Sequence, residues 1–532
     1  MKKLLSIFFF LFCFAASGQS LHVDSTRFIT GLKCCTQIVN SIPTADKGML
    51  LLGSENNNPG GIIPPFPIDT STAGNLMIVK IDSNQKMSWI RIYGGSENEG
   101  AGPACQLPDG GYAVLASTQS SNGNVTGFHG GYDYWLLRLD DSGNLLWENC
   151  YGGPGDEGAS SLALTPDGGF IMLGTTNDTG GEVTLHYGDE LSYDWWVVKT
   201  DSLGNLQWQK TLGGTGQETA QGTILSIDSA YYLISSSTST DHNCTDTCWH
   251  ANVNTGYDYY LLKLDGSGNV LWDSSYGGSN DEDEAYAIFD TRDSTIVITG
   301  STASDNYMVT GYVGEGDMWV VKVNKNGTLL WQKTLGSSSE ETAGTGICVA
   351  PEGGYMAYGN MRNITTSIED FWLFNLDSAA NIITNKTFGG DTTTFIVETA
   401  YSIIPYLNGY VAVGLSGTDT FTEGSTYGNF DGGGPFISYI GYWPLAVMNI
   451  YIQNEELQIY PNPANKYTTV VMPNTNGEIQ VINCVGERFF EEKISQNTNY
   501  VNIHTEAWAT GLYIVKWQGD DGIVLTKKLI IN

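Results

Sequence analysis

The chain has 532 residues, of which 41% are hydrophobic and 12% aromatic, a composition that suits a folded protein of more than one domain and excludes disorder. Its 57 Asp and Glu outnumber its 24 Lys and Arg, and the net charge of −33 excludes the basic surface that binding to nucleic acid or to anionic membranes requires. The 65 Gly and few charged residues indicate β-strands joined by tight turns.

Residues 1–18 have the three regions of a secretory signal peptide. Met1-Lys2-Lys3 is basic, residues 4–14 form an apolar run, and small residues follow as far as Gly18. The run is shorter than the ~20 residues that a membrane-spanning helix needs, and no other stretch approaches that length. We therefore expect cleavage between Gly18 and Gln19, and no transmembrane segment in the mature chain.

Residues 19–443 contain a sequence that repeats about every 60 residues. One copy has Asp140-Asp-Ser-Gly143-Asn, then Trp147, then Gly152-Gly153. A second segment of each copy carries a turn, such as Pro166-Asp-Gly-Gly169, and a small residue five positions further on. Aligned on that small residue, seven copies are visible, at Gly53, Ala116, Gly174, Ser235, Gly300, Gly359 and Gly414.

Each copy is predicted to form four short antiparallel strands, because apolar alternation is interrupted by turn sequences at fixed places. The connection between the second and third strands varies in length and composition, which marks a face of loops. Four-stranded units repeated at this spacing are typical of β-propeller blades. We therefore predict an all-β protein with a seven-bladed β-propeller over residues 19–443. The Trp that begins each fourth strand should pack between blades, and Arg27-Phe-Ile-Thr30 should supply the outer strand of the last blade.

The repeats resemble those of β-propellers in secreted proteins of environmental bacteria, in which a Gly-Gly pair, an acidic residue, an Ala and a Gly-Gly-aromatic hairpin recur. In one copy these residues are Gly152, Gly153, Glu157, Ala159 and Gly168-Gly169-Phe170. The resemblance implies an architecture and no single activity.

After a linker, residues 444–456, a segment with a different pattern occupies residues 457–532. Alternating apolar residues and turn signals run from Leu457 to the closing Lys527-Lys528-Leu-Ile-Ile-Asn, which predicts a small antiparallel β-sandwich. The segment closely resembles the type A C-terminal sorting domain of the type IX secretion system of Bacteroidota, an Ig-like sandwich. An ordinary Ig-like accessory domain is the alternative.

This second resemblance implies a cellular location and a partner. The signal peptide would direct the chain to the periplasm, and the type IX secretion machinery would recognise residues 457–532 and carry the protein across the outer membrane. In that family the domain is removed, and the protein is released or tethered to surface polysaccharide. We therefore expect a secreted or outer-membrane surface-attached protein.

Six carboxylates share one position of the repeat, two residues before the Ala of the first strand, where the first blade has Lys33. If that strand lines the axis, their oxygens could bind a cation such as Ca²⁺ at the channel mouth. The interpretation that we favour is structural, with each carboxylate accepting N–H groups from the Gly-Gly turn between blades and with neither metal nor cofactor bound. The six are Glu99, Glu157, Glu218, Asp283, Glu341 and Glu398.

A second acidic series precedes the third strands and is interpreted by the same structural argument. Its members are Asp133, Asp194, Asp258, Asp317 and Asp370.

One blade carries a long insert, His242-Asn-Cys244-Thr-Asp-Thr-Cys248-Trp-His250. Its Cys-x3-Cys spacing is compatible with zinc, yet a second pair of ligands elsewhere in the chain is missing. In an oxidising compartment a Cys244–Cys248 disulfide is the simpler interpretation, and free thiols are the third. Cys105 and Cys348 share one register of the first strand and are expected to be small buried apolar residues.

Cys34 and Cys35 are adjacent, and the repeat Asp-x-x-Gly-Asn-x-x-Trp, residues 140–147 in one copy, resembles that of quinoprotein dehydrogenases. Those propeller enzymes use a vicinal disulfide over a quinone. They have eight units where this chain has seven, and no cofactor-contacting residues can be matched to them. No hydrolase motif is present either, so no catalytic residue is assigned.

Two functions of different class remain. The first is a propeller that binds a glycan or protein through its variable loops, with Tyr187, Trp249 and Tyr307 as candidate contacts. The second is an enzyme with a site in the axial funnel, either polysaccharide-acting or a quinoprotein-like dehydrogenase. The acidic residues are repeated rather than gathered in one asymmetric cluster, which favours binding.

Overall fold

All 36 regular elements described in the computed structural model are β-strands, which confirms the all-β class. The chain divides into two compact units, Met1–Leu445 and Ala446–Asn532. The structure describes residues 19–28, 36–56, 73–83, 86–189, 191–219, 223–227, 229–244, 256–279, 283–291, 293–314, 316–338, 340–350, 354–363, 369–388, 398–406, 409–416, 426–427, 434–444, 457–460, 464, 466–471, 476–483, 487–494, 500–519 and 524–531.

Six antiparallel sheets of the first unit have four strands in chain order, as predicted for blades. The first three sheets consist of β2 (Thr36–Pro43), β3 (Met49–Asn56), β4 (Gly74–Ile81) and β5 (Met87–Tyr93); β6 (Glu99–Gln106), β7 (Tyr112–Thr118), β8 (Asp133–Leu139) and β9 (Leu145–Tyr151); and β10 (Gly158–Leu164), β11 (Phe170–Thr176), β12 (Asp194–Thr200) and β13 (Leu206–Leu212). The next three consist of β14 (Thr223–Ile227), β15 (Ala230–Ser237), β16 (Asp258–Leu264) and β17 (Val270–Tyr276); β18 (Glu284–Asp290), β19 (Thr295–Thr302), β20 (Asp317–Asn324) and β21 (Leu329–Leu335); and β22 (Glu340–Val349), β23 (Tyr355–Asn363), β24 (Glu369–Leu376) and β25 (Ile382–Phe388).

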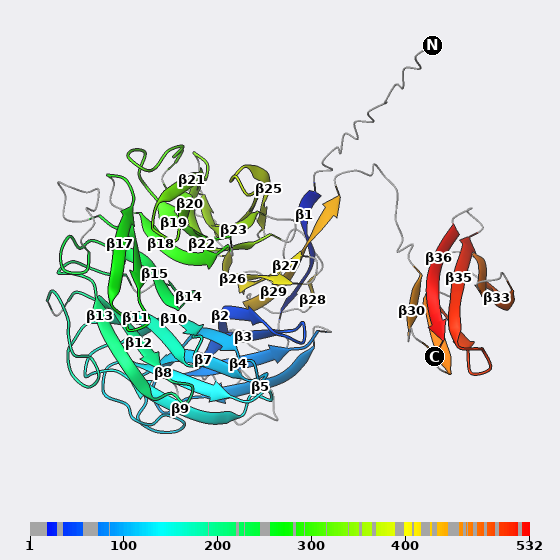
Figure 1. Ribbon diagram of the computed structural model, residues 1–532, viewed down its shortest axis with the longest axis horizontal. Helices are drawn as coiled ribbons and strands as arrows, with labels where there is room; N and C mark the ends of the chain where they lie inside the picture. Colours follow the sequence, from blue (N-terminus) through cyan, green and yellow to red (C-terminus); the bar gives the residue numbers. More distant parts are fainter. Residues whose placement is uncertain are drawn as a thin grey trace, which may run out of the picture. The chain divides into compact units, whose positions relative to one another are not determined.

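The seventh sheet joins the two ends of the unit. It consists of β26 (Glu398–Tyr406), β27 (Gly409–Ser416), β29 (Gly434–Pro444) and β1 (Gln19–Phe28), with the short β28 (Thr426–Tyr427) at its edge. β1 runs antiparallel to β29, with Gln19 opposite Pro444 and Phe28 opposite Phe436. The first strands of successive blades contact one another all round the ring, including β26 with β2 (Figure 1).

This topology confirms the seven-bladed propeller. It also confirms that the N-terminal strand completes the last blade, since Arg27 and Phe28 belong to β1. Residues 29 and 30 of the predicted segment lie outside the described residues, as do residues 1–18, so cleavage after Gly18 remains a prediction.

The third strand of each blade shows why the blades assemble. Every residue of β4, β8 and β12 is buried, on both faces of the strand. Side chains such as Trp195 and Trp196 are neighbours in sequence, point to opposite faces and are both fully buried. A single sheet buries neither face, so each blade needs a neighbour on both sides, and the apolar cores lie between blades.

The predicted Trp residues pack between blades. Trp147 of β9 lies against Phe170 of the next blade, with ring centroids 6.1 Å apart, and the same contact joins Trp89 to Tyr112. The Trp147 ring also covers Gly204, in the turn between the third and fourth strands of that next blade. Gly204 has a positive φ of 81°, and its carbonyl accepts a hydrogen bond from the Tyr151 hydroxyl.

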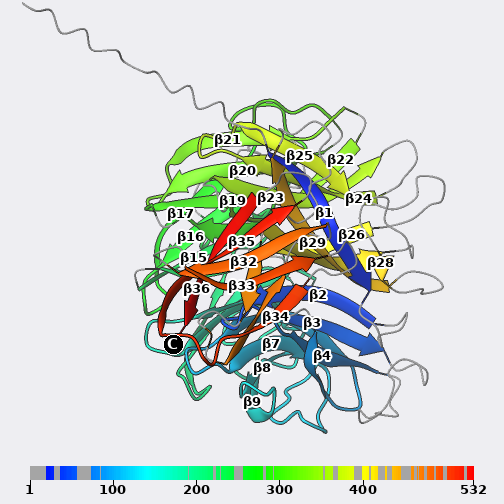
Figure 2. The same ribbon diagram turned by 90° about the vertical axis from the view of Figure 1, so that its right-hand side faces the viewer.

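The second unit is the predicted small sandwich of two sheets. One sheet contains β30 (Gln458–Tyr460), β31 (Tyr467–Val471) and β34 (Tyr500–His504); the other has the order β33 (Arg488–Ile494), β32 (Gly477–Asn483), β35 (Gly511–Gly519) and β36 (Val524–Ile531) (Figure 2). Val470, Ile479, Val515, Trp517 and Leu529 belong to the core of this unit and are fully buried.

Gly204→Ala should destabilise the propeller more than Gly168→Ala. Both glycines have a positive φ, 81° and 80°, so each substitution carries a backbone penalty of about 1–2 kcal/mol. A Cβ at Gly204 would lie 2.4 Å from Asn149 Nδ2 and 2.8 Å from the Trp147 ring, which adds a clash of about 1–3 kcal/mol. Nothing lies within 4 Å of a Cβ at Gly168. Denaturant unfolding of the two variants measures the difference, and equal losses would contradict the packing role of Trp147.

Candidate functional site

The repeated acidic residues meet at one end of each pair of neighbouring blades. Asp133 begins β8 opposite Thr118, and the same pairing places Asp194 opposite Thr176. The Gly-Gly turn that leads into the next blade starts at this same end, because the fourth strand runs back beside the third. We call each such junction, made of the Asp, the Gly-Gly turn and the next carboxylate, an acidic seam.

The carboxylates that precede the first strands are buried and hydrogen-bonded in one pattern. Glu157 accepts hydrogen bonds from the Gly153 N–H at 2.7 Å and from the Thr176 hydroxyl at 2.8 Å. Glu99 and Glu218 accept equivalent bonds from Gly95 with Thr118 and from Gly214 with Ser237, and Asp283 from Gly278 with Thr302. The bonds from the Gly-Gly turn that the sequence predicted are therefore present. The side chains of Glu341 and Glu398 lie outside the described residues.

The Asp series has donors that differ from those expected. Oδ2 of Asp133 accepts a bond from the backbone N–H of His129 at 2.9 Å, and Oδ2 of Asp317 accepts one from Val313 at 2.8 Å. Oδ2 of Asp194 accepts one from Tyr187 at 2.5 Å. These N–H groups belong to the loop between the second and third strands, because each Asp stands where that loop ends. The Asp residues therefore anchor the loops, whereas the Glu residues hold the Gly-Gly turns.

At Gly152, Gly213 and Gly277 the first glycine of the Gly-Gly turn lies between the two carboxyl groups of a seam. A Cβ on Gly152 would lie 2.6 Å from Asp133 Oδ1 and 2.6 Å from Glu157 Oε2. At Gly213 the distances to Asp194 Oδ1 and Glu218 Oε2 would be 2.8 and 2.6 Å. Only glycine fits at these positions, so the Gly-Gly pair and the two acidic residues depend on one another.

Burial shifts these carboxyl groups towards their neutral forms. It raises the pKa of Asp133 to about 6, against the opposing hydrogen bonds of His129, and the pKa of Glu157 to about 7. Burial, followed by the nearby Glu218, raises the pKa of Asp194 to about 8, and burial also raises the pKa of Glu218. Two ionised carboxylates this close together would repel each other, which also favours the neutral form of Asp194.

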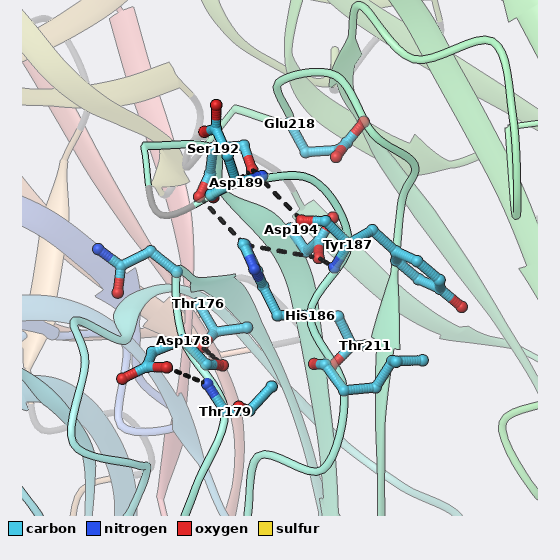
Figure 3. A network of polar contacts seen from close by, with 12 residues as sticks. Thr176, Asp178, Thr179, His186, Tyr187, Asp189, Ser192, Asp194, Thr211 and Glu218 are labelled. Atoms are coloured by element: carbon cyan, nitrogen blue, oxygen red, sulfur yellow. Dashed lines mark hydrogen bonds and ion pairs between the residues drawn. The ribbon is translucent and has the colours of Figure 1, made fainter.

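Histidines distinguish two neighbouring seams, a feature that the sequence reasoning missed. His129 Nδ1 lies 2.8 Å from Asp133 Oδ2, and its Nε2 lies 3.5 Å from Glu182 Oε2 of the next blade. In the following seam His186 Nε2 lies 3.8 Å from Asp194 Oδ2 and 3.2 Å from the Ser192 carbonyl (Figure 3). The Ser192 hydroxyl donates to the Asp189 carbonyl at 2.8 Å, so it is bound within its loop rather than activated by His186.

A third repeated pair, also missed, lies at the opposite end of the blades. Lys199 Nζ lies 2.9 Å from Asp167 of the Pro-Asp-Gly-Gly turn, and Lys80 lies 2.8 Å from Asp46. Lys322 with Asp293 and Arg138 with Asp109 repeat the contact. The signal was a basic residue near the end of these four third strands, which faces the first turn of its own blade across the sheet.

The predicted cysteine and aromatic sites are only partly described. Cys244 is buried, with its Sγ 3.5 Å from the Ser237 hydroxyl. Its predicted partner Cys248 lies outside the described residues, as do Cys34, Cys35, Trp249 and His250, so the disulfide stays a prediction. Cys348 is buried, as predicted, whereas Cys105 is half-buried. Burial raises the pKa of each thiol to about 12, as expected of unreactive thiols. Tyr187 stacks on His242 at 4.3 Å, and Tyr307 is 62% exposed.

The described residues lack two further kinds of feature. No three His, Cys, Asp or Glu side chains there are grouped so that they could hold a metal ion. Within the same part of the chain, no helix has the length and apolar character needed to cross a membrane.

Comparison with known proteins identifies the second unit. Residues 458–532 match the family described as "Secretion system C-terminal sorting domain". This match confirms the predicted type IX sorting domain and indicates export, followed by secretion or attachment to the cell surface. No curated protein sequence matches the chain.

Solved structures resemble the chain only distantly. A mutant of apocarotenoid oxygenase from Synechocystis has 12% identity and a TM-score of 0.37, over 69% of this chain and 93% of that one. A member of the DUF4221 family from Bacteroides vulgatus has 11% identity and a TM-score of 0.31, over 65% and 97%.

Glu157→Gln should flatten the dependence of stability on pH. Because the pKa of Glu157 is raised from 4.5 to about 7, the folded chain takes up a proton at a pH where the unfolded chain does not. The wild type therefore gains stability as the pH falls through about 7, and the gain is complete near pH 4.5. Glutamine cannot ionise, so the deficit of the variant relative to the wild type should be larger at about pH 5 than at about pH 8. Melting temperatures across this range measure it.

Asp167→Asn is the matched control. The Thr165 hydroxyl and then Lys199 lower the pKa of Asp167 from 3.8 to about 2, so it titrates below this window in both states. Its pH profile should run parallel to that of the wild type above about pH 5. A Glu157→Gln profile parallel to the wild type would contradict the raised pKa.

Removal of calcium should leave the melting temperature unchanged, because the described carboxylates of the first series already accept backbone and hydroxyl hydrogen bonds. A bound cation would instead add its binding energy to the folded state, and excess chelator would lower the melting temperature. Unfolding with calcium and with excess chelator separates the two cases. A large drop in the wild type that Glu157→Gln and Glu218→Gln no longer show would place a cation at the channel mouth.

Proposed function

We propose that this secreted or cell-surface protein binds an extracellular glycan or protein through the loops that join the second and third strands of its blades. The sorting domain directs export, and the propeller provides the binding face. Asp133, Asp194 and Asp317 carry the proposal, because each fixes a loop of different sequence through a backbone N–H of that loop.

The anchored loops differ in sequence, whereas the residue that anchors each of them is always a buried Asp. They span residues 119–132, 177–193 and 303–316, and each presents one N–H to the buried Asp at its end. A rigid scaffold that holds variable loops in fixed places is the usual arrangement of binding proteins. The arrangement therefore supports recognition by several loops together.

Exposed apolar side chains on these loops supply candidate contacts. Leu191 is 85% exposed in the loop of the third blade, and Tyr307 and Val313 are exposed in the loop of the fifth. Large apolar groups at the ends of loops are typical contacts for sugar rings and for protein side chains. Tyr187 is the weaker candidate, because its ring already stacks on His242.

The enzymatic alternative, with a polysaccharide-acting or quinoprotein-like site in the axial funnel, needs acid or base groups that a substrate can reach. Asp133, Glu157, Asp194 and Glu218 have shifted pKa values but are fully buried within the seams. Their hydrogen bonds join blades and loops. Burial of these groups favours binding over catalysis.

Loop substitutions should weaken binding without affecting stability. The mature protein should bind a member of a panel of polysaccharides and extracellular proteins, tested with and without calcium. Tyr307→Ala and Leu191→Ser should each weaken that binding about tenfold, equivalent to about 1.4 kcal/mol. Leu146→Ser, on the exposed outer strand β9, is the control and should bind as the wild type does.

Two results would contradict this function. Binding that survives both loop substitutions together would exclude the loop face. Release of sugar from a polysaccharide, or oxidation of a substrate upon addition of a quinone, would establish the enzymatic alternative instead.

A further inference from the structure

The sorting domain has an exposed apolar surface on the outward face of its last two strands. Leu512 and Ile514 of β35 are 46% and 37% exposed, and Ile530 of β36 is 44% exposed. Leu512 stands opposite Ile530, and Ile514 stands opposite Ile482 of β32. Directly opposed side chains of neighbouring strands lie about 5 Å apart, so these residues form one continuous patch. We call it the hairpin face.

The core of the domain does not explain the hairpin face. Tyr513, Val515 and Trp517 alternate with the exposed residues along β35 and point inward, where they are buried. The sandwich is thus already closed on its inner side. An outward strand position normally carries a polar residue, and a patch of large aliphatic side chains there marks an interaction surface.

Charge distinguishes this surface from the rest of the chain. Residues 457–532 carry six Lys and Arg and seven Asp and Glu, whereas the remaining residues carry 18 and 50. Lys528 stands opposite Ile514, and Lys516 lies two residues along the same face of β35. The hairpin face is therefore apolar with two Lys at its border, whereas Glu478 and Glu491 lie further out on the same face, opposite Gln518 and Gln480. It belongs to an almost neutral unit of a strongly acidic protein. It fits a partner with an apolar groove and acidic groups beside it.

We propose that the hairpin face is the surface by which the type IX secretion machinery recognises this protein. The inference rests on the sorting function of residues 458–532 and assigns that function to particular side chains. The occupant is a protein of the export apparatus with a complementary apolar and acidic surface. The propeller, with its excess of acidic residues, is repelled by such a surface and does not compete for it.

The test uses the full chain in a host with an intact type IX pathway. The double variant Leu512→Ser/Ile530→Ser should accumulate in the periplasm, with at least a tenfold decrease outside the cell. Because both side chains point outward, the retained protein should keep a melting temperature close to that of the wild type. Lys516→Glu/Lys528→Glu should also reduce export, since it reverses the charge of the border.

The matched control removes exposed aliphatic side chains elsewhere. Leu146→Ser/Leu330→Ser changes two exposed leucines on the outer strands of propeller blades, and this variant should be exported normally. Equal retention of the control would show a general loss of solubility or folding and would overturn the proposal.

Deletion of residues 457–532 distinguishes the sorting function of the domain from recognition through the hairpin face. If the deletion variant still reached the medium, the sorting function itself would be wrong. If deletion blocked export while the double Ser variant passed normally, the sorting function would stand and the hairpin face would be excluded. If the wild type were a dimer and the double Ser variant a monomer that is exported normally, the face would bind a second copy of the chain. That result would overturn the proposal.

Discussion

The structure of the propeller depends on one constraint, that a blade cannot bury its own third strand. Residues such as Trp195 and Trp196 point to opposite faces of one sheet, and both are buried only because a neighbouring blade covers each face. Every blade therefore needs two neighbours, and the row of blades must close into a ring. The ring closes through β1, which pairs with β29 and so joins the two ends of the propeller in one sheet.

Close packing of the blades buries the carboxyl groups of the acidic seams, which is unfavourable for their ionised forms. The same burial lets these groups accept hydrogen bonds from the backbone. Carboxyl groups that are buried between blades are driven towards their neutral forms, as the raised pKa values of Glu157 and Asp194 show. They are retained because each supplies acceptors for backbone N–H groups that would otherwise be buried without partners. The Glu residues fix the turns between blades, and the Asp residues fix the loops. The loops can then vary in sequence without loosening the ring.

Contacts that recur in every repeat could be predicted from the sequence. Contacts that depend on the residues of a neighbouring blade or of a variable loop could not. Periodicity revealed the blades, the Trp contacts and the closing strand, because each recurs at a constant spacing. The donor to Asp133 was not foreseen because the sequence of its loop does not repeat, although the N–H four residues before the Asp bonds both Asp133 and Asp317. His129 and His186 were missed because they occur in only two loops, so no repeat marks them, although their partners Asp133 and Asp194 lie close by in sequence.

Ring closure also gives a physical reason for a separate sorting domain. Gln19 pairs with Pro444, so the propeller is complete only when nearly its whole sequence is present, and such distant pairing folds slowly. A sorting signal formed by the ring could be recognised only after the ring had closed, and it would change whenever the loops changed. Residues 457–532 have their own core and pair over short distances, from Gly511 with Ile531 to Gln518 with Val524 in the last hairpin. The sorting signal can therefore stay constant while the binding face changes, and that separation of roles follows from the different range of contacts in the two units.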